Sequence, residues 1–107
     1  MNFRSLEIVV GKKVVDADLT PQDGGLVFEG GITLNIYNRY TVFDRNQVAV
    51  RKILVGAIVT KVEEEKDHIF IIFGEEIKME IDLTDDAYSS PEAMQLRVPG
   101  KSIVIWN

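Results

Sequence analysis

Two stretches of the chain, "LVFEGGITLNI" from Leu26 to Ile36 and "IIFGEEIKMEI" from Ile71 to Ile81, align without a gap at an offset of 45 residues. In each stretch, apolar residues alternate with other residues on both sides of a short turn, which is the pattern of a β-hairpin. A three-residue loop, at 29–31 or 74–76, places the alternating apolar residues on one face. The two stretches therefore predict two antiparallel hairpins that each present one apolar face to a core.

The loop length also determines which residues face each other across each hairpin. In the first hairpin Phe28 faces Ile32. Gly31 suits the left-handed conformation of the third loop position, whereas Glu76 suits it less well, so we expect the second turn to differ. The shared apolar faces are predicted to hold Leu26, Phe28, Ile32, Leu34 and Ile36 in the first hairpin, and Ile69, Ile71, Phe73, Ile77, Met79 and Ile81 in the second.

The offset extends beyond the hairpins and predicts an internal repeat of residues 6–38 and 51–83. Each copy begins with a short apolar segment that ends at Gly11 or Gly56 and continues into a strand. A glycine just past the C-cap favours a short helix, but "LEIVV" and "VAVRKILV" are β-branched enough for strands, so both interpretations stay open. Seven identities support the alignment: Ile8/Ile53, Val10/Val55, Gly11/Gly56, Val14/Val59, Phe28/Phe73, Ile32/Ile77 and Ile36/Ile81.

The outer face of the second hairpin is apolar at Phe70 and Ile72. Two neighbouring side chains of this size would form an exposed apolar patch, so we expect something to cover them. One candidate is the C-terminal segment 94–106, whose alternation around Pro99-Gly100 predicts a closing hairpin. The other candidate is a second protomer, which would make Phe70 and Ile72 oligomer contacts.

These patterns predict a mainly β fold, of the β-rich α+β type, in a single domain that spans residues 1–107. Two copies of a unit of short helix or turn, strand and hairpin pack as a sandwich or partial barrel, and the C-terminal hairpin closes it. Hydrophobic residues make up 46% of the chain and charged residues 27%, which is ordinary for a globular protein with a buried core.

Composition and charge exclude several functional classes. The absence of cysteine excludes disulfides, thiolate catalysis and thiolate metal sites. The apolar run before Gly11 is too short for a signal or membrane-spanning segment, so we expect a cytoplasmic protein without a membrane partner. Seventeen acidic against 12 basic residues give a net charge of -5, which disfavours nucleic acid and favours a basic protein partner.

The segment "IDLTDDAYSSPEAM", residues 81–94, is rich in acidic and hydroxyl side chains. Asp82, Asp85 and Asp86 offer oxygen ligands to a hard cation, but their spacing matches no complete calcium loop. A turn in which short acidic side chains accept hydrogen bonds from nearby backbone amides explains the same spacing. We therefore favour a connector between strands and expect no metal and no cofactor.

The other titratable candidates suit an exposed surface. His68 is the single histidine and is expected to be an exposed residue at a strand end. The run from Glu63 to Glu65 predicts the solvated mouth of a hairpin loop. No nucleophile elbow surrounds Ser89 or Ser90, so no catalytic residue is predicted.

The stretch "NIYNRYTVFDRN", residues 35–46, is the aromatic and basic part of the chain. Its tyrosines and arginines suit a protein interface, suit base stacking equally, and have plain solvated surface as the alternative. The acidic net charge favours the protein partner over nucleic acid. The predicted partner-binding residues are Tyr37, Arg39, Tyr40, Asp82, Asp85, Asp86 and Tyr88.

The end of the chain combines "PEAM" at 91–94 with "IVIW" at 103–106. The stretch "DDAYSSPEAMQLRVPGKSIVIWN" resembles the ending of a family of small uncharacterised β-rich bacterial proteins, and "ILVGAIVTKVEE" looks similar too. Some of these proteins resemble immunity proteins of bacterial toxin systems, which are small, acidic and cytoplasmic and bind a partner toxin. The resemblance implies a bacterial protein with such a partner and assigns no functional residue.

Three functional hypotheses follow from the sequence. The first, which we favour, is a non-enzymatic protein-binding module, immunity-like, with an acidic and tyrosine-bearing surface. The second is a small carboxylate-based hydrolase or ligand-binding barrel, which requires a concave pocket where at least two carboxylates converge. The third is a structural homodimer with Phe70 and Ile72 at the subunit contact.

Overall fold

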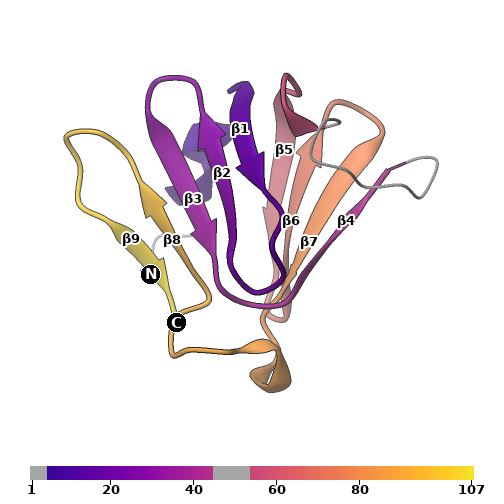
Figure 1. Ribbon diagram of the computed structural model, residues 1–107, viewed down its shortest axis with the longest axis vertical. Coiled ribbons are helices and arrows are strands. Elements are labelled where there is room, and N and C mark those ends of the chain that lie inside the picture. The colour runs from indigo at the N-terminus through magenta and orange to yellow at the C-terminus, as the bar shows by residue number, and fades with distance from the viewer. Residues whose placement is uncertain (1–4, 45–53) are drawn as a thin grey trace.

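Nine strands and two short 3-10 helices form the part of the chain that the structure describes, residues 5–44 and 54–107 of a computed structural model (Figure 1). The mainly β fold predicted from the sequence is confirmed. In chain order the elements are η1 (Ser5–Val9), β1 (Val14–Asp18), β2 (Gly24–Phe28), β3 (Ile32–Ile36), β4 (Tyr40–Phe43), β5 (Val59–Glu64), β6 (His68–Phe73), β7 (Ile77–Asp82), η2 (Asp85–Ala87), β8 (Met94–Arg97) and β9 (Val104–Trp106).

The strands form two sheets that pack against each other. One sheet has the strand order β1-β2-β3-β8-β9 and the other has the order β4-β7-β6-β5. Neighbouring strands within each sheet are antiparallel. The C-terminal hairpin β8–β9 is present as predicted and extends the first sheet beside β3, on the left in Figure 1.

Both central hairpins have the register that the alternation predicts. Phe28 lies opposite Ile32 in β2–β3, and Phe73 lies opposite Ile77 in β6–β7. A slip of one residue would turn every apolar side chain of a strand toward solvent, so the core selects this register. The inner faces are buried at Leu26, Phe28, Ile32, Leu34, Ile36, Ile69, Ile71, Phe73, Met79 and Ile81.

The two hairpin turns differ, as expected. Gly31 has a φ of 80° at the third loop position of the first turn. In the second turn the positive φ of 61° belongs to Gly74, and Glu76 has no such conformation. Gly30 in the first turn also has a positive φ, of 86°. A residue with a β-carbon is strained in this region, so both turns adopt left-handed conformations only where the sequence supplies glycine.

The two sheets meet where the segments after Gly11 and Gly56 run antiparallel to each other. Each segment donates backbone hydrogen bonds to the other and accepts backbone hydrogen bonds from it. The four backbone N–H donors and their carbonyl acceptors are Gly11 to Val59 at 2.7 Å, Gly56 to Val14 at 2.8 Å, Val14 to Ala57 at 2.8 Å and Val59 to Lys12 at 3.0 Å. Each bond has a counterpart at an offset of 45 residues.

The same offset relates further features of the two segments. The bulge of β1 against β2 starts at Val14, and that of β5 against β6 starts at Val59. Val9 and Leu54, the counterparts before the two glycines, are both fully buried. The internal repeat nevertheless stays a prediction, because similar hairpins produce similar registers whether or not they arose from one unit.

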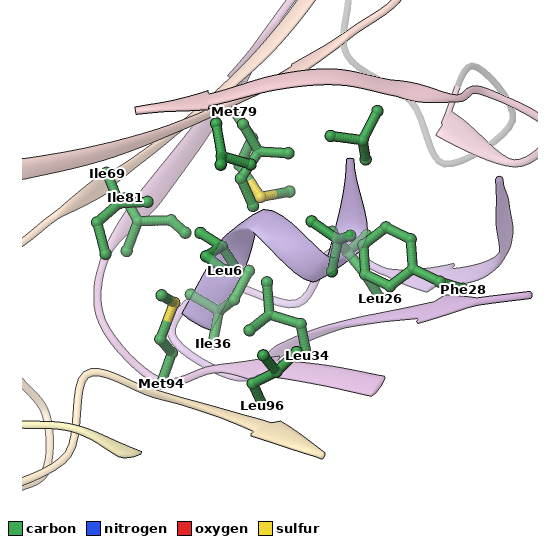
Figure 2. Packing of buried hydrophobic residues seen from close by; sticks show 14 of the residues in the cluster. Leu6, Leu26, Phe28, Leu34, Ile36, Ile69, Met79, Ile81, Met94 and Leu96 are labelled. Carbon is green, nitrogen blue, oxygen red and sulfur yellow. The ribbon is translucent and has the colours of Figure 1, made fainter. Parts of the chain in front are cut away.

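The segment before Gly11, for which the sequence left a short helix and a strand both open, is the 3-10 helix η1. Its residues Leu6 and Val9 are fully buried between the sheets. Figure 2 shows Leu6 between Ile36 of the first sheet and Ile81 of the second. The helix predicted before Gly56 lies, up to residue 53, outside the described residues.

The expectation that the C-terminal hairpin covers Phe70 and Ile72 is wrong. β8 pairs with β3 in the other sheet instead, with Leu96 opposite Leu34. This pairing supplies hydrogen-bond partners to the backbone groups at the edge of β3, and it buries Met94 and Leu96 in the core. A position over Phe70 would leave these backbone groups unpaired and these two side chains outside the core.

Phe70 is covered by side chains of its own sheet. The ring of His68 stacks on it with centroids 5.9 Å apart, and Lys78 Nζ lies 4.9 Å from the ring centroid. His68 Nε2 also lies 3.1 Å from Glu80 Oε2, so the histidine is half-buried rather than exposed as expected. The oligomer contact at Phe70 and Ile72 stays a prediction.

Tyr40 closes the end of the first sheet by packing its ring on Gly24. The Tyr40 hydroxyl donates a hydrogen bond of 2.8 Å to the carbonyl of Thr20. A β-carbon at Gly24 would lie only 2.6 Å from the Tyr40 hydroxyl oxygen. Burial, with smaller contributions from Asp18 and Asp23, raises the pKa of Tyr40 to about 12.

We expect Gly24→Ala to destabilise the protein by about 1–3 kcal/mol, because its β-carbon would displace the Tyr40 ring. The displaced ring should then be better solvated, so the pKa of Tyr40 should fall from about 12 toward its ordinary 10.0. Urea denaturation and ultraviolet titration of tyrosinate measure the two effects.

The matched control is Gly25→Ala, because the atoms nearest to its β-carbon lie 3.9 Å away. This variant should change the free energy of unfolding by less than about 1 kcal/mol and leave the Tyr40 titration unchanged. Equal losses at the two positions would contradict the packing argument.

Candidate functional site

The acidic segment after β7 is a connector that its own side chains hold in place. Asp82 Oδ1 accepts hydrogen bonds from the Thr84 amide at 2.8 Å and from the Thr84 hydroxyl at 2.6 Å. The same Thr84 hydroxyl lies 2.9 Å from Asp86 Oδ1, and η2 follows directly. The interpretation as a turn is confirmed, and no group of three metal-ligating side chains occurs among the described residues.

Two neighbours after β3 tie this connector to the rest of the fold. Arg39 Nη2 donates to Asp82 Oδ2 at 2.8 Å and lies 3.5 Å from Asp86 Oδ1. The buried Asn38 donates through Nδ2 to the Asp82 carbonyl at 2.8 Å. Three of the predicted partner-binding residues, Arg39, Asp82 and Asp86, therefore form one cluster, which already uses its polar atoms to attach the connector.

The pKa of Asp82 falls from its ordinary 3.8 to about 2. The hydrogen bonds from Thr84 are the largest cause, and the Arg39 guanidinium adds a smaller effect. A carboxylate with so low a pKa stays ionised at physiological pH and is satisfied within its own chain. It is therefore a poor proton donor or acceptor for catalysis.

A cleft of about 590 Å³ opens beside the connector, at the end of the molecule where η2 and the C-terminus lie (Figure 1). Its volume is in the range of sites that bind small molecules or single side chains. The β5–β6 loop, the connector and the C-terminal strand each contribute to the lining. The polar and aromatic lining residues are Glu64, Glu65, Lys66, Asp85, Tyr88, Trp106 and Asn107, and the apolar ones are Ile69 and Leu83.

Glu64 is the most constrained carboxylate of this cleft. Its Oε1 accepts a hydrogen bond of 3.0 Å from Trp106 Nε1. Its Oε2 is buried and has no hydrogen-bond partner within the described part of the chain. Burial raises the pKa of Glu64, the Trp106 hydrogen bond opposes that effect, and the charge of Glu7 adds to it.

A second hollow, of about 340 Å³, lies at the other end of β6 and is more open. Its charged lining residues are Glu75 and Glu76 of the β6–β7 turn, and both are exposed. Within the described part of the chain, this hollow lacks the buried unpaired carboxylate oxygen that marks the larger cleft. We therefore take the larger cleft as the candidate site.

The structure divides the seven predicted partner-binding residues among several places. Tyr40 packs on Gly24, and Tyr37 is tied to the C-terminal segment through its backbone, whose carbonyl accepts from Ser89 at 2.9 Å. Arg39, Asp82 and Asp86 form the connector cluster. Only Asp85 and Tyr88 line the cleft.

The sequence interpretation missed Glu64 and Trp106 as site residues. Glu64 was expected at a solvated loop mouth, but the Trp106 ring covers it and leaves it half-buried. The sequence did contain a feature that indicates such a pairing. A single tryptophan at a strand end needs a hydrogen-bond acceptor for its indole N–H when it is buried. The sequence does not indicate which residue accepts this hydrogen bond.

Comparison of the chain with protein-family models, with curated proteins and with solved structures found no match. No helix among the described residues is long and apolar enough to cross a membrane.

We expect Asp82→Asn to lower the free energy of unfolding by about 1–2 kcal/mol at neutral pH, because it weakens hydrogen bonds that an ionised carboxylate accepts. The folded-state pKa of about 2 lies below the ordinary 3.8, so the stabilisation is present above pH 3.8 and disappears as the pH falls toward 2. Urea denaturation of both proteins across this range measures the difference.

Asp85→Asn is the control within the same connector, and it should change stability by less than about 0.5 kcal/mol. A loss at Asp82 that persists undiminished at pH 2 would show that ionisation of this carboxyl does not matter.

Proposed function

We propose that this protein is a non-enzymatic binding module for a basic protein, and that the partner docks on its acidic end. The acidic end is defined as the β5–β6 loop, residues 65–67, the connector 82–88 and the cleft between them. The observation that carries the proposal is the cleft itself, in which three carboxylates lie beside two aromatic rings.

The charge of this end supports a basic partner. Glu65, Asp67, Asp85 and Asp86 are all exposed there. Lys66 opposes them in the loop, and Arg39 is already paired with Asp82 and Asp86. A surface with this excess of negative charge attracts positive patches and accelerates their association.

The aromatic rings of the cleft support a protein partner in particular. Tyr88 is half-buried at the cleft wall and Trp106 is 4% exposed. Tyrosine and tryptophan are the side chains most enriched in the parts of interfaces that contribute most binding energy. The resemblance of the C-terminal segment to immunity-like proteins suggests a toxin as the kind of partner.

The same cleft favours a small hydrolase as a second candidate. Glu64 has a raised pKa and Asp85 lines the same cleft, and a raised-pKa acid beside a second carboxylate is the pairing that acid–base hydrolysis needs. Turnover of a chromogenic ester or glycoside that is lost in Glu64→Gln would favour this candidate over the binding module.

The binding module predicts that charge reversal at the acidic end abolishes partner capture. The immobilised wild-type chain should retain a discrete basic protein from its host, and the variant Glu65→Lys/Asp85→Lys should not. With the purified partner, this double variant should raise the dissociation constant at least about tenfold, with an effect that weakens at high salt.

The matched control is Glu75→Lys/Glu76→Lys, which changes the net charge equally at the opposite end of β6. This control should retain the partner like the wild type. Retention of no protein, or equal loss in both double variants, would overturn the proposed docking site.

A further inference from the structure

Glu64, which lines the cleft, has a buried hydrogen-bond acceptor that is not used. Trp106 donates to one oxygen of Glu64, while Oε2 of the same carboxylate is buried and has no hydrogen-bond partner among the described residues. A buried carboxylate oxygen without a donor is unfavourable, because folding removes its water and supplies nothing in return. A donor group that enters the cleft would remove this penalty.

The charges around Glu64 determine what kind of donor is favoured. Glu65 and Asp85 line the same cleft, and Glu7 of η1 acts on the Glu64 carboxyl. Lys66 is the one cationic side chain that the described residues contribute to the lining. A donor that carries a positive charge therefore gains from the neighbouring carboxylates, whereas an anion or a neutral donor does not.

The rest of the lining suits a cation on an apolar stem. Tyr88 contributes a half-buried aromatic ring, which attracts a cation placed over its face, and the buried Trp106 contributes the donor that holds Glu64. Ile69 and Leu83 add aliphatic surface, which suits methylene groups better than a hydrated metal ion. Lysine and arginine combine these two properties.

We propose that the cleft receives the side chain of one lysine or arginine that a basic partner presents, with the Glu64 carboxylate as its acceptor. This inference rests on the proposed function and names the group that enters the site. Tyr88 flanks the alkyl stem, and Glu65 and Asp85 supply additional negative charge near the mouth.

Such a site should release the cation as the pH falls. Only the ionised form of Glu64 pairs with an ammonium or guanidinium group, and burial raises the pKa of this carboxyl. The other charged groups that face it are Glu7, Glu65, Lys66 and Asp85. Affinity should therefore decrease on acidification through the raised pKa of Glu64, and the neutral side chain of the variant Glu64→Gln should remove this dependence.

The test titrates the full chain with Nα-acetyl-lysine methylamide and with its apolar analogue, Nα-acetyl-norleucine methylamide. The chain has one tryptophan, so the Trp106 indole N–H gives a single unambiguous NMR signal beside Glu64. We expect a saturable shift of this signal with the lysine probe and none with the norleucine probe. The variant Glu64→Gln should weaken lysine binding about tenfold and abolish its pH dependence.

Glu75→Gln is the matched control and should bind the lysine probe like the wild type. Absence of a saturable shift, an equal shift with norleucine, or undiminished binding by Glu64→Gln would each overturn the inference. The inference can fail while the proposed function stands: if Glu65→Lys/Asp85→Lys loses the protein partner but the lysine probe does not bind, the docking surface is supported and the side-chain pocket is not.

Discussion

Reciprocal backbone hydrogen bonds between the segments 11–14 and 56–59 join the two sheets, and the rest of the architecture depends on them. They place the N-terminal ends of β1 and β5 side by side, so the apolar faces of the two hairpins turn toward each other. In the described residues these bonds end at Val14 and Val59, where both strands carry a bulge. A bulge bends its strand and increases the local twist.

Side chains of other segments fill the interior between the two sheets. Leu6 and Val9 of η1 occupy the interior, and the buried side of the C-terminal hairpin completes it with Met94, Leu96 and Trp106. Trp106 lies opposite Met94 in the β8–β9 pair, and its indole donates to Glu64 on the other sheet. The contact that completes the core is therefore the contact that forms the inner wall of the cleft.

Alternation was enough to predict the hairpins, because a period of two fixes the register once one face is buried. It could not assign the C-terminal hairpin to a sheet edge, since the backbone of any edge strand offers the same bonds and Met94 and Leu96 would fit any apolar face. The prediction of the site was incomplete for the same reason. Asp85 and Tyr88 could be proposed from local composition, but the pairing of Glu64 with Trp106 joins residues 42 positions apart and has no local pattern.

Two carboxylates at the acidic end differ in how many of their hydrogen-bonding groups the fold already uses. Asp82 accepts bonds from Thr84 and Arg39, and its pKa falls to about 2, so its charge is already used to hold the connector. Glu64 accepts one bond, keeps a buried oxygen without a donor among the described residues, and has a raised pKa. Binding of a cation favours the ionised form of an acid. The gain is largest for a carboxylate whose ionised form has the fewest hydrogen bonds and ion pairs within its own chain. Of the acids that are most conspicuous in the sequence, Asp82 therefore maintains the fold, while Glu64, from an ordinary-looking glutamate run, keeps an oxygen without a donor among the described residues.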